Sequence, residues 1–385
     1  MKIIAFYLPQ FHTFPENDLW WGKGFTEWTN VKKAKPLFPG HNQPRVPLNK
    51  NYYDLTNVET LIWQANLARK YGIYGFCYYH YWFDGHMLME KPMEIMLNNK
   101  AVDIPFCICW ANENWTKAWA DHSKEVLISQ TYGDKNDWKN HFEYFLPFFK
   151  DERYIYMDGK PVLVIYRPGL IPTLREMLEY WNELAILNGL QGITYMYQHN
   201  TYNHKNDRNG DLFSYAIEYQ PGRIKEYQKN RPKREQQWFT PKIVLKKILN
   251  IMVNKCSIKQ TKMSTIWYDY DDAWKRILDI KPQDSKMIPG AFVDWDNSPR
   301  YGGRASLYLG VTPEKFEKYL SLQIKHAKDK YQKDIMFLFA WNEWGESGYL
   351  EPDEKNGYRM LEAVRQALIE TNEFPDWEKE NGKIN

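Results

Sequence analysis

The sequence lacks the features that mark several large classes of protein. No apolar run approaches the roughly 18 residues that a membrane-spanning helix needs, so we expect none. The opening stretch MKIIAFYLPQF carries one lysine and a short apolar run broken by Pro9, and no small-residue cleavage site follows it. It therefore predicts a first β-strand and not a secretion signal, which favours a cytoplasmic protein. Cysteine is scarce and no C-x-x-C pair occurs, so we expect structural thiols in a reducing compartment at Cys77, Cys107, Cys109 and Cys256.

Aromatic side chains, by contrast, are abundant. They make up 17% of the 385 residues, with 17 Trp and 28 Tyr, and the hydrophobic fraction of 43% can supply a large core. Flat rings match the apolar faces of pyranose sugars, and the Tyr OH and Trp NH groups can bond sugar hydroxyls. The composition favours either an aromatic-rich core or a saccharide-binding site, and it argues against a disordered chain.

Eight short apolar or β-rich runs, each bounded by turn residues or charge, predict strands. They are KIIAFYLP, YGFCYYHYW, PFCICWAN, PVLVIYRP, ITYMYQH, FSYAIEY, IPGAFVDWDN and IMFLFAWNEW, which begin at Lys2, Tyr74, Pro105, Pro161, Ile193, Phe213, Ile288 and Ile335. Helix-period segments lie between most of them, including VETLIWQANLARKYG, PTLREMLEYWNELAILNG and TPEKFEKYLSLQIKHAKDKY. This alternation predicts one α/β domain over residues 1–385, a (β/α)8 TIM barrel. The rival, an open doubly wound sheet, usually carries a glycine-rich phosphate turn after its first strand, where this chain reads LPQFHTFPEN.

Polar and aromatic residues gather at the carboxyl ends of the predicted strands. In a (β/α)8 barrel the active site lies on that face, because the loops that follow the strands converge there. Strand five ends in Gln198 and His199, for example, and strand six ends in Glu218 and Tyr219. From these ends we select as candidate substrate-binding residues Tyr7, His80, Trp82, Trp110, Asn112, Glu113, Tyr166, His199, Glu218, Asp294, Trp341, Asn342 and Trp344.

Two loops on the same face are long. The first follows strand one, contains WWGKGFTEWTNVKKAKPLFPGHNQPRVP, and is aromatic enough to form a lid or a wall for substrate. The second, residues 220–286, is a basic insertion, because twelve Lys and Arg face only two Glu over residues 223–262. Within it PKIVLKKILNIMV, residues 241–253, predicts a short amphipathic basic helix. That helix either covers the flank of the barrel or contacts an anionic membrane surface or a lipid-linked acceptor, whereas no nucleic-acid-binding module is recognisable.

The apolar run FLFAWNEWGES, residues 337–347, ends abruptly in two carboxylates. Glu343 and Glu346 are three residues apart where a strand becomes a loop, and a tight turn through Gly345 would direct both into one cavity. Cleavage or exchange of a glycosidic bond needs a protonated acid beside an ionised base or nucleophile. Trp341 and Trp344 would supply apolar walls that separate the two pKa values. We therefore predict Glu343 and Glu346 as catalytic, against the plainer interpretation of two solvated or helix-capping acids.

Other patterns support weaker alternatives. DYD (residues 269–271) and DWD (residues 294–296) fit the loose D-x-D pattern of metal-dependent nucleotide-sugar transferases, although DYDD also suits a helix start and DWD could bind sugar hydroxyls. His80 and His199 lack a third ligand at useful spacing, so we expect no metal and no cofactor. The further acids that could replace the chosen catalytic pair are Glu27, Glu113 and Glu218.

Longer motifs point to a family. AFYLPQFH, WWGKGFTEWTNV, LFPGHNQPRVP, YGFCYYHYWF, WANENWT and FAWNEWGE together resemble the WbsX-type glycosyltransferases of surface-polysaccharide clusters, over nearly the whole chain. Those proteins are similar in turn to glycoside hydrolase family 99, the endo-α-mannosidases, whose strand-eight motif has the form E-W-x-E. The resemblance implies a retaining, metal-independent barrel enzyme. It also implies that Glu343 acts as a base on the sugar 2-hydroxyl, which attacks C1 to form an epoxide-like intermediate, and that Glu346 is the general acid/base.

The sequence therefore predicts an enzyme that acts on glycosidic bonds of a cell-surface polysaccharide or its precursor, and the resemblance suggests a mannoside-like substrate. Interception of the intermediate by water gives hydrolysis, and interception by a sugar hydroxyl gives transfer. The alternatives are a metal-dependent nucleotide-sugar glycosyltransferase and a non-catalytic carbohydrate-binding protein. The expected location is the cytoplasm, peripheral at the inner membrane face if the basic insertion binds lipid.

Overall fold

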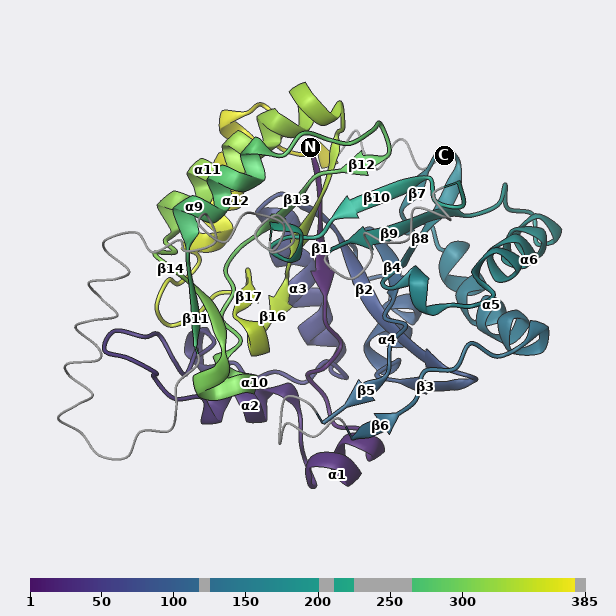
Figure 1. Cartoon of the computed structure of the whole chain (residues 1–385), viewed down its shortest axis with the longest axis horizontal. Coiled ribbons are helices and arrows are strands. Elements are labelled where there is room, and N and C mark those ends of the chain that lie inside the picture. Colours follow the sequence, from purple (N-terminus) through teal and green to yellow (C-terminus); the bar gives the residue numbers. More distant parts are fainter. Residues whose placement is uncertain (118–124, 201–210, 225–264, 378–385) are drawn as a thin grey trace, which may run out of the picture.

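Nine parallel strands form a barrel in the computed structural model, which describes residues 1–117, 125–200, 211–224 and 265–377 (Figure 1). Their order around the sheet is β12-β10-β9-β8-β4-β2-β1-β15-β13. Each of the eight predicted runs supplies a strand, and the predicted (β/α)8 barrel is confirmed. The strands are β1 (Lys2–Tyr7), β2 (Ile73–Phe83), β4 (Phe106–Trp110), β8 (Lys160–Ile165), β9 (Thr194–His199), β10 (Tyr215–Glu218), β12 (Met287–Ile288), β13 (Gly290–Phe292) and β15 (Ile335–Phe339).

The seventh predicted run closes the ring as two short pieces. β12 pairs with β10, β13 pairs with β15, and Pro289 separates the two pieces. The second piece begins at Gly290. A Cβ atom at this position would lie 1.8 Å from the main-chain oxygen of Glu218, which is too close for any other residue. The main chains of β10 and β13 therefore approach closely where the strand changes partner, and only glycine fits that approach.

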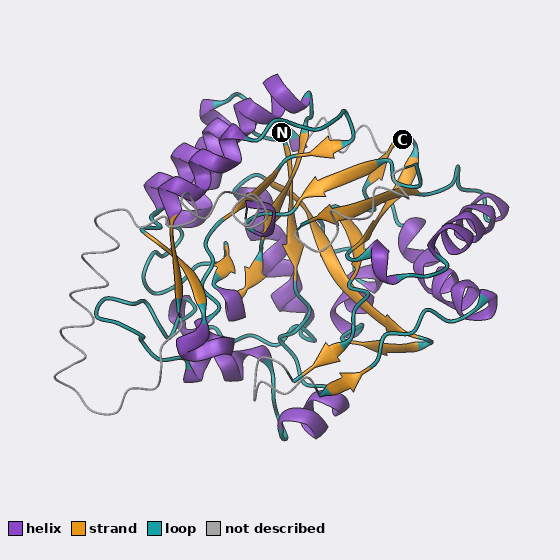
Figure 2. Ribbon diagram, viewed as in Figure 1, coloured by secondary structure: helices purple, strands orange, loops and turns teal. Residues whose placement is uncertain are grey.

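Helices cover the outside of the barrel (Figure 2). Among them are α3 (Val58–Lys70), α4 (Lys91–Asn98), α5 (Lys135–Phe149), α6 (Leu174–Leu187), α9 (Tyr270–Asp279), α11 (Pro313–His326) and α12 (Arg359–Glu370). The helices expected from periodicity correspond to α3, α6 and α11. The side chain of Asn57 caps α3 by accepting a hydrogen bond from the main-chain N–H of Glu59, and the chain leaves the helix through Gly72 at a φ of +86°.

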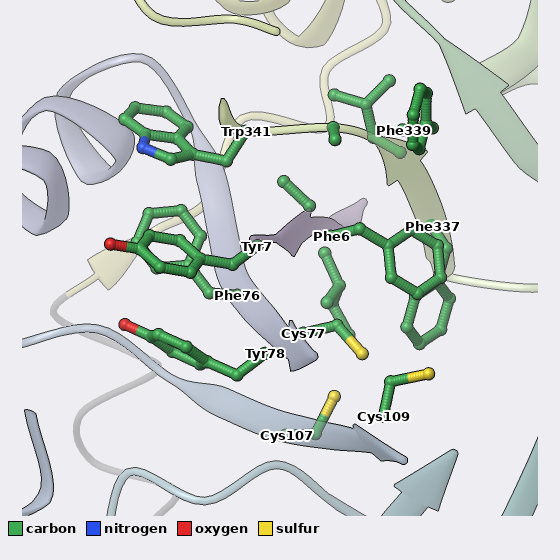
Figure 3. Close-up of a cluster of buried hydrophobic side chains, with 14 of the residues drawn as sticks. Phe6, Tyr7, Phe76, Cys77, Tyr78, Cys107, Cys109, Phe337, Phe339 and Trp341 are labelled. Carbon is green, nitrogen blue, oxygen red and sulfur yellow. The ribbon is translucent and has the colours of Figure 1, made fainter. Parts of the chain in front are cut away.

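Side chains alternate between the two faces of each barrel strand. Figure 3 shows Phe6 and Tyr7 on opposite sides of β1, with Phe6 beside Phe337 and Tyr7 beside Phe76. Phe6 faces the barrel interior, whereas Tyr7 faces the helix layer, where its hydroxyl donates to Gln64 of α3 at 2.7 Å. This alternation decides which strand-end residues can reach a site in the barrel mouth.

The cysteines that the structure describes lie close together in the hydrophobic core (Figure 3). Cys77 of β2 and Cys107 and Cys109 of β4 are fully buried and carry free thiols. Burial raises the pKa of the Cys77 thiol well above its usual value, so it stays protonated and unreactive. This agrees with the predicted structural role, and Cys256 lies outside the described residues.

The long loop after β1 carries α1 (Pro15–Trp21), α2 (Glu27–Lys33) and the turn η1 (Leu48–Lys50). Within the expected insertion at 220–286, the structure describes β11 (Ile266–Asp269) and α9, whereas the predicted basic helix at 241–253 lies outside the described residues. Among the described segments, no helix combines the length and apolar character that a bilayer crossing requires. The shorter elements are β3 (His86–Leu88), β5 (Trp115–Thr116), β6 (Val126–Ile128), β7 (Tyr156–Met157), η2 (Pro168–Leu170), α10 (Ser298–Tyr301), η4 (Gly302–Arg304), β14 (Ser306–Leu309), η5 (Ala327–Tyr331), β16 (Asn342–Glu343), η6 (Trp344–Glu346) and β17 (Gly348–Tyr349).

Candidate active site

A cavity of about 340 Å³ lies at the carboxyl ends of the barrel strands, and we call it the acid cavity. Nine aromatic residues from several strands and loops contribute to its wall, and four carboxylates enter it. The long loop after β1 contributes to this wall, as its composition predicts. The lining residues are Leu8, Gln10, Asn17, Trp21, Phe25, Glu27, Tyr79, Tyr81, Met89, Ala111, Glu113, Asn114, Trp115, Thr116, Leu127, Tyr166, Tyr219, Arg300, Tyr301, Phe339, Glu343 and Glu346.

Arg300 is the centre of the charged part of the acid cavity. It lies on α10, which is beside α2 (Figure 1), and its Nε donates to Glu27 of α2 at 2.9 Å. Its Nη2 lies 3.1 and 3.2 Å from the two carboxylate oxygens of Glu343. Its Nη1 lies 3.3 Å from Glu346. One buried guanidinium therefore holds three carboxylates, which is one positive charge against three negative charges when all are ionised.

The two predicted catalytic acids differ in their surroundings. The side chain of Glu343 is 3% exposed and that of Glu346 is 18% exposed. Burial raises the pKa of Glu343 to about 8; the Arg300 guanidinium opposes that shift, and the negative charges of Glu346 and Glu27 add to it. Both acids contact the same guanidinium, so they are closer together than the roughly 9.5 Å at which acid pairs can still act on one glycosidic bond.

The turn that follows β15 directs both acids into the acid cavity. Glu343 caps the short η6 helix by accepting a hydrogen bond from the main-chain N–H of Glu346 at 3.0 Å. Gly345 lies between them, and a Cβ atom there would be 2.3 Å from the Glu27 carboxylate and 2.8 Å from Nε of Arg300. A glycine at this position therefore lets the Glu27–Arg300 ion pair pack directly against the turn.

Two predicted site residues besides the acid pair line the acid cavity. Glu113 is partly exposed there and pairs with Arg167 at 2.9 Å. Tyr166 lines the cavity wall from the end of β8. The structure thus brings Glu113, Tyr166, Glu343 and Glu346 together, and their roles toward substrate stay predictions.

Two predicted asparagines fasten neighbouring strand ends to each other. The Asn342 side chain accepts from the main-chain N–H of Leu8 at 2.8 Å and donates to the Leu8 carbonyl at 3.0 Å. Asn112 likewise accepts from the N–H of Arg167 at 2.7 Å and donates to its carbonyl at 2.8 Å. Each amide replaces a pair of main-chain hydrogen bonds where the ladder between two strands stops. Both side chains are fully buried, and neither lines the acid cavity.

The other predicted residues on or beside the strands do not line the acid cavity, because they face the helix layer. His80 bonds His141 of α5 at 3.0 Å, and Trp82 donates to Asp137 of the same helix at 3.0 Å. The residues that face outward or pack behind the turn are Tyr7, His80, Trp82, Trp110, His199, Glu218, Trp341 and Trp344.

Their immediate neighbours fill the cavity wall instead. Tyr79 and Tyr81 of β2 line it where His80 and Trp82 do not, and Tyr219 lines it where Glu218 does not. Glu218 instead accepts a hydrogen bond from Tyr331 at 2.6 Å. A shift of one residue along a strand moves a side chain to the opposite face. Side chains alternate between the two faces of each strand, and Phe6 faces the barrel interior. Counting this alternation along each strand would have identified these tyrosines as the residues that face the cavity.

The DWD segment forms a structural tie, by which we mean hydrogen bonds and ion pairs that hold the loop after β1 to the end of strand seven. Asp294 accepts from Arg45 at 2.7 Å, and Asp296 accepts from His41 at 2.8 Å and Gln43 at 2.7 Å. The remaining oxygen of each aspartate accepts a main-chain N–H, so protein donors contact all four carboxylate oxygens. Asp294 is buried and does not line the acid cavity, and its predicted contact with substrate has no support in this arrangement.

DYD also has structural partners. Asp269 caps α9 by accepting from the main-chain N–H of Asp272, as the helix-start interpretation predicts, and Asp271 accepts from Lys315 and Tyr319. Over the described ranges, no group of three or more His, Cys, Asp or Glu side chains is arranged to hold a metal ion. In the described residues, protein donors already contact both carboxylate oxygens of Asp271, Asp294 and Asp296.

Comparisons with known proteins agree with this architecture. The family model described as Glycosyltransferase WbsX matches residues 3–364. Two proteins, each described as uncharacterized protein WxcX and coming from two strains of Xanthomonas campestris pv. campestris, are 34% identical over 368 residues. The match covers 95% of this chain and 49% of each relative, so the chain spans about half the length of the curated relatives it matches.

Solved glycoside hydrolases share the fold. A GH99 endo-alpha-mannosidase from Bacteroides thetaiotaomicron, in complex with BIS-TRIS-propane, is 12% identical with a TM-score of 0.55, over 96% of this chain and 97% of that one. A glycoside hydrolase-like protein is 11% identical with a TM-score of 0.54, over 95% of this chain and 93% of that one. At these low identities the similarity shows a shared barrel fold and nothing beyond the fold.

Proposed function

The chain belongs to the WbsX glycosyltransferase family, and we propose that it breaks and forms glycosidic bonds with retention of configuration, using Glu343 and Glu346 in the acid cavity. One observation carries this proposal: both carboxylates of the strand-eight turn contact one buried arginine and enter the same aromatic-walled cavity. Rings suit the apolar faces of a sugar, and two acids in different surroundings suit the proton transfers.

Glu343 has the properties of a proton-transfer group poised near neutral pH. Two N–H groups donate to its Oε1, from Arg300 and from the main chain of Glu346, and these contacts favour its ionised form. Burial favours its protonated form, and the balance is a pKa of about 8. General acid–base catalysis works best when the pKa lies close to the working pH.

We assign the two steps in the order that the family resemblance implies. Glu343 takes the proton of the sugar 2-hydroxyl, whose oxygen attacks C1, while Glu346 protonates the leaving oxygen. An incoming hydroxyl then attacks C1 and gives its proton to Glu346, and Glu343 returns a proton to the 2-oxygen. The incoming hydroxyl is that of a sugar acceptor in transfer or of water in hydrolysis, and the family description favours transfer.

Arg300 is the positioning residue of this mechanism. Its contacts with Glu27, Glu343 and Glu346 fix the acids relative to each other and offset their mutual repulsion. The pKa of Arg300 is raised well above its usual value, because the three carboxylates outweigh the effect of burial, so the group stays charged. Loss of this charge would raise the pKa of Glu343 further and leave the acid pair loosely held.

The charge of the acid cavity argues against a nucleotide-sugar donor. Its described lining contains four glutamates and one arginine, so a diphosphate would enter a region of excess negative charge. A neutral glycoside meets no such penalty. We therefore rank the metal-dependent nucleotide-sugar transferase below the acid-pair enzyme, and a non-catalytic binder below both, because simple binding gains nothing from a costly cluster of buried acids.

The finer identity of the substrate is part of the proposal. A cell-surface polysaccharide or its precursor, with a mannoside-like unit, is the substrate that the family resemblance suggests. A lipid-linked acceptor or an anionic membrane surface would meet the basic stretch at 223–262, most of which lies outside the described residues. Sedimentation with anionic and neutral vesicles checks this, and equal behaviour in both would remove the membrane part, together with a location at the inner membrane face.

The experiment that tests the function is a product assay with purified protein. It would use α-linked oligosaccharides, with and without nucleotide sugars and with and without a chelator, and would follow anomeric configuration by NMR. We expect retained products without nucleotide sugar and in the presence of chelator. Products that require both a nucleotide sugar and a divalent metal would replace our proposal with the alternative.

A further inference from the structure

A second cavity, of about 550 Å³, lies between α3 and the start of α12, and we call it the outer cavity. Its described lining includes no residue of a barrel strand and shares no residue with the acid cavity. Its volume falls within the roughly 300–1,000 Å³ of small-molecule sites. The lining residues are Pro47, Leu48, Asn49, Lys50, Asn51, Tyr52, Tyr53, Trp63, Trp344, Glu351, Pro352 and Tyr358.

Aromatic rings form the walls of the outer cavity. Trp63 of α3 lies 6.3 Å from Tyr53, measured between ring centroids, and Tyr52 meets the edge of Trp28 at 5.2 Å. Tyr358 is 38% exposed at the rim. Rings that are held at an angle to each other and partly open to solvent present flat apolar faces to a ligand.

Polar groups complete the outer cavity. Glu351 is 2% exposed, and its carboxylate accepts from Gln64, Tyr53 and Trp344, each at 2.7 Å. Burial raises the pKa of Glu351 to about 7, so its charge at neutral pH is partial. At the rim, the side-chain amides of the exposed Asn49 and Asn51 supply donors and acceptors, and the ammonium group of Lys50 supplies donors.

The outer cavity is preformed, because hydrogen bonds fasten its rim loop to the residues after β17. The main-chain N–H of Leu48 donates to the Pro352 carbonyl at 3.0 Å, and that of Glu354 donates to the Val46 carbonyl at 2.9 Å. From the same loop, Tyr53 donates to Glu351. A ligand therefore meets rings that are already ordered and does not have to order the loop itself.

We propose that the outer cavity is an accessory binding site for one neutral sugar residue of the polymer on which the acid cavity acts. The proposal rests on the proposed function for the identity of that polymer. Angled rings together with amide groups suit the apolar face and the hydroxyls of a pyranose. The lining carries one cationic and one acidic side chain, Lys50 and Glu351, so it has no excess charge that would select an ion.

Trp344 connects the two cavities. Its indole N–H bonds Glu351 at the outer cavity, and its main chain lies between Glu343 and the turn that carries Glu346. Trp28 packs against Trp344 at 5.4 Å, and its neighbour Glu27 reaches the acid cavity. A polymer bound at the outer cavity would therefore be held beside the wall of the acid cavity, which raises its local concentration there.

The test measures saccharide binding without turnover, in full-length protein that carries Glu346→Gln. Isothermal titration and saturation-transfer NMR would use a panel of neutral oligosaccharides with α-manno, α-gluco, β-gluco and rhamno residues. Into this background we would introduce Trp63→Ala and Tyr358→Ala separately, and compare them with Tyr156→Ala, which removes an exposed ring outside both cavities. Circular dichroism and thermal melting would verify folding, and Tyr358→Ala keeps the test valid if Trp63→Ala does not fold.

We expect a dissociation constant about tenfold weaker for Trp63→Ala, somewhat less weakening for Tyr358→Ala and no change for Tyr156→Ala. In protein with an intact acid pair, the same changes should raise KM for the polymer and leave kcat on a short aryl glycoside unaltered. Equal binding by all three variants across the whole panel would overturn the proposal. So would a wild-type dimer that Trp63→Ala turns into a monomer, because the face would then belong to a second copy of the chain.

The two proposals fail separately. Full turnover by Glu343→Gln and Glu346→Gln would remove the proposed function, and Trp63-dependent binding of a saccharide would still identify the outer cavity as a sugar site. Loss of turnover in the acid variants with no Trp63-dependent binding would keep the function and remove the accessory site.

Discussion

Two clusters of buried carboxylates flank the mouth of this barrel, each built around an arginine, and they differ in how completely their charges are met. At the end of strand seven, Arg45 pairs with Asp294, and His41 and Gln43 contact Asp296, so protein donors contact every carboxylate oxygen. At the end of strand eight, three glutamates share the guanidinium of Arg300.

The pKa values of Asp296 and Glu343 differ in the same sense, while burial raises the pKa of Asp294 in the first cluster. Hydrogen bonds and the nearby positive charge of Arg45 overcome burial and lower the pKa of Asp296 to about 2. Burial and neighbouring negative charge raise the pKa of Glu343 to about 8. The first cluster holds the loop after β1 against the barrel. The second contains an acid with a raised pKa, Glu343, that lines the acid cavity. Incomplete charge pairing in a cavity therefore distinguishes the proposed catalytic site from a structural cluster of similar composition.

The largest expected effect is on turnover. Glu343→Gln and Glu346→Gln should each lower kcat about 10²- to 10⁴-fold on an α-linked oligosaccharide, because each removes one proton transfer. Glu314→Gln, on the exposed start of α11, is the matched control and should keep the wild-type rate. Near-full activity in both acid variants would place the chemistry elsewhere and end the distinction between the clusters.

Stability should respond in the other cluster. Arg45→Met leaves Asp294 buried and unpaired, so we expect the free energy of unfolding to fall by about 3–5 kcal/mol in urea denaturation. Arg45→Met combined with Asp294→Asn removes both charges and should recover part of the loss. An Arg45→Met protein as stable as the wild type would show that the tie contributes nothing.

Acid should weaken the same tie. The pKa of Asp296 falls from 3.8 to about 2 on folding, so its ionisation stabilises the protein above pH 3.8. That contribution, about 2 kcal/mol, is lost as the pH falls from 3.8 to 2. The measurement is the pH dependence of the unfolding free energy in wild type and Asp296→Asn. Identical slopes over this window would contradict the assigned ion pairing.

The pH profile of activity tests whether Glu343 takes part in the proton transfer. Glu343 must be ionised and Glu346 protonated in the first step, so kcat/KM should be bell-shaped, with the limb near pH 8 set by Glu343. Arg300→Lys, which offers a single point charge, should move this limb to higher pH. A profile with no limb near pH 8 would contradict the participation of Glu343.

Much of the architecture could be predicted from the sequence. The eight strands, the helices α3, α6 and α11, and the placement of Glu343 and Glu346 in a mouth cavity follow from apolar periodicity and from a turn with glycine. These signals are local, and they do not depend on the partners that a residue meets in the fold.

The detail of the cavity wall could not be predicted in the same way. The choice between Glu218 and Tyr219, or between His80 and Tyr79, depends on which face of a fully buried strand looks inward, and near-continuous apolar strands hide that alternation. Arg300 has no motif of its own, because its importance comes from Glu27 and Glu343, which are 273 and 43 residues away in the chain. Such a cluster exists only after the barrel has closed.

The amide of Asn342 has a consequence for biosynthesis. It bonds Leu8 across a sequence separation of 334 residues, at the seam where β15 meets β1. A nascent chain emerges from its N-terminus, so β1 must wait until residue 342 has been made before this seam can form. The acid pair follows β15 directly and reaches Arg300 and Glu27 only through that last step. Chains that end before residue 343 therefore lack the contacts of Arg300 with Glu343 and Glu346.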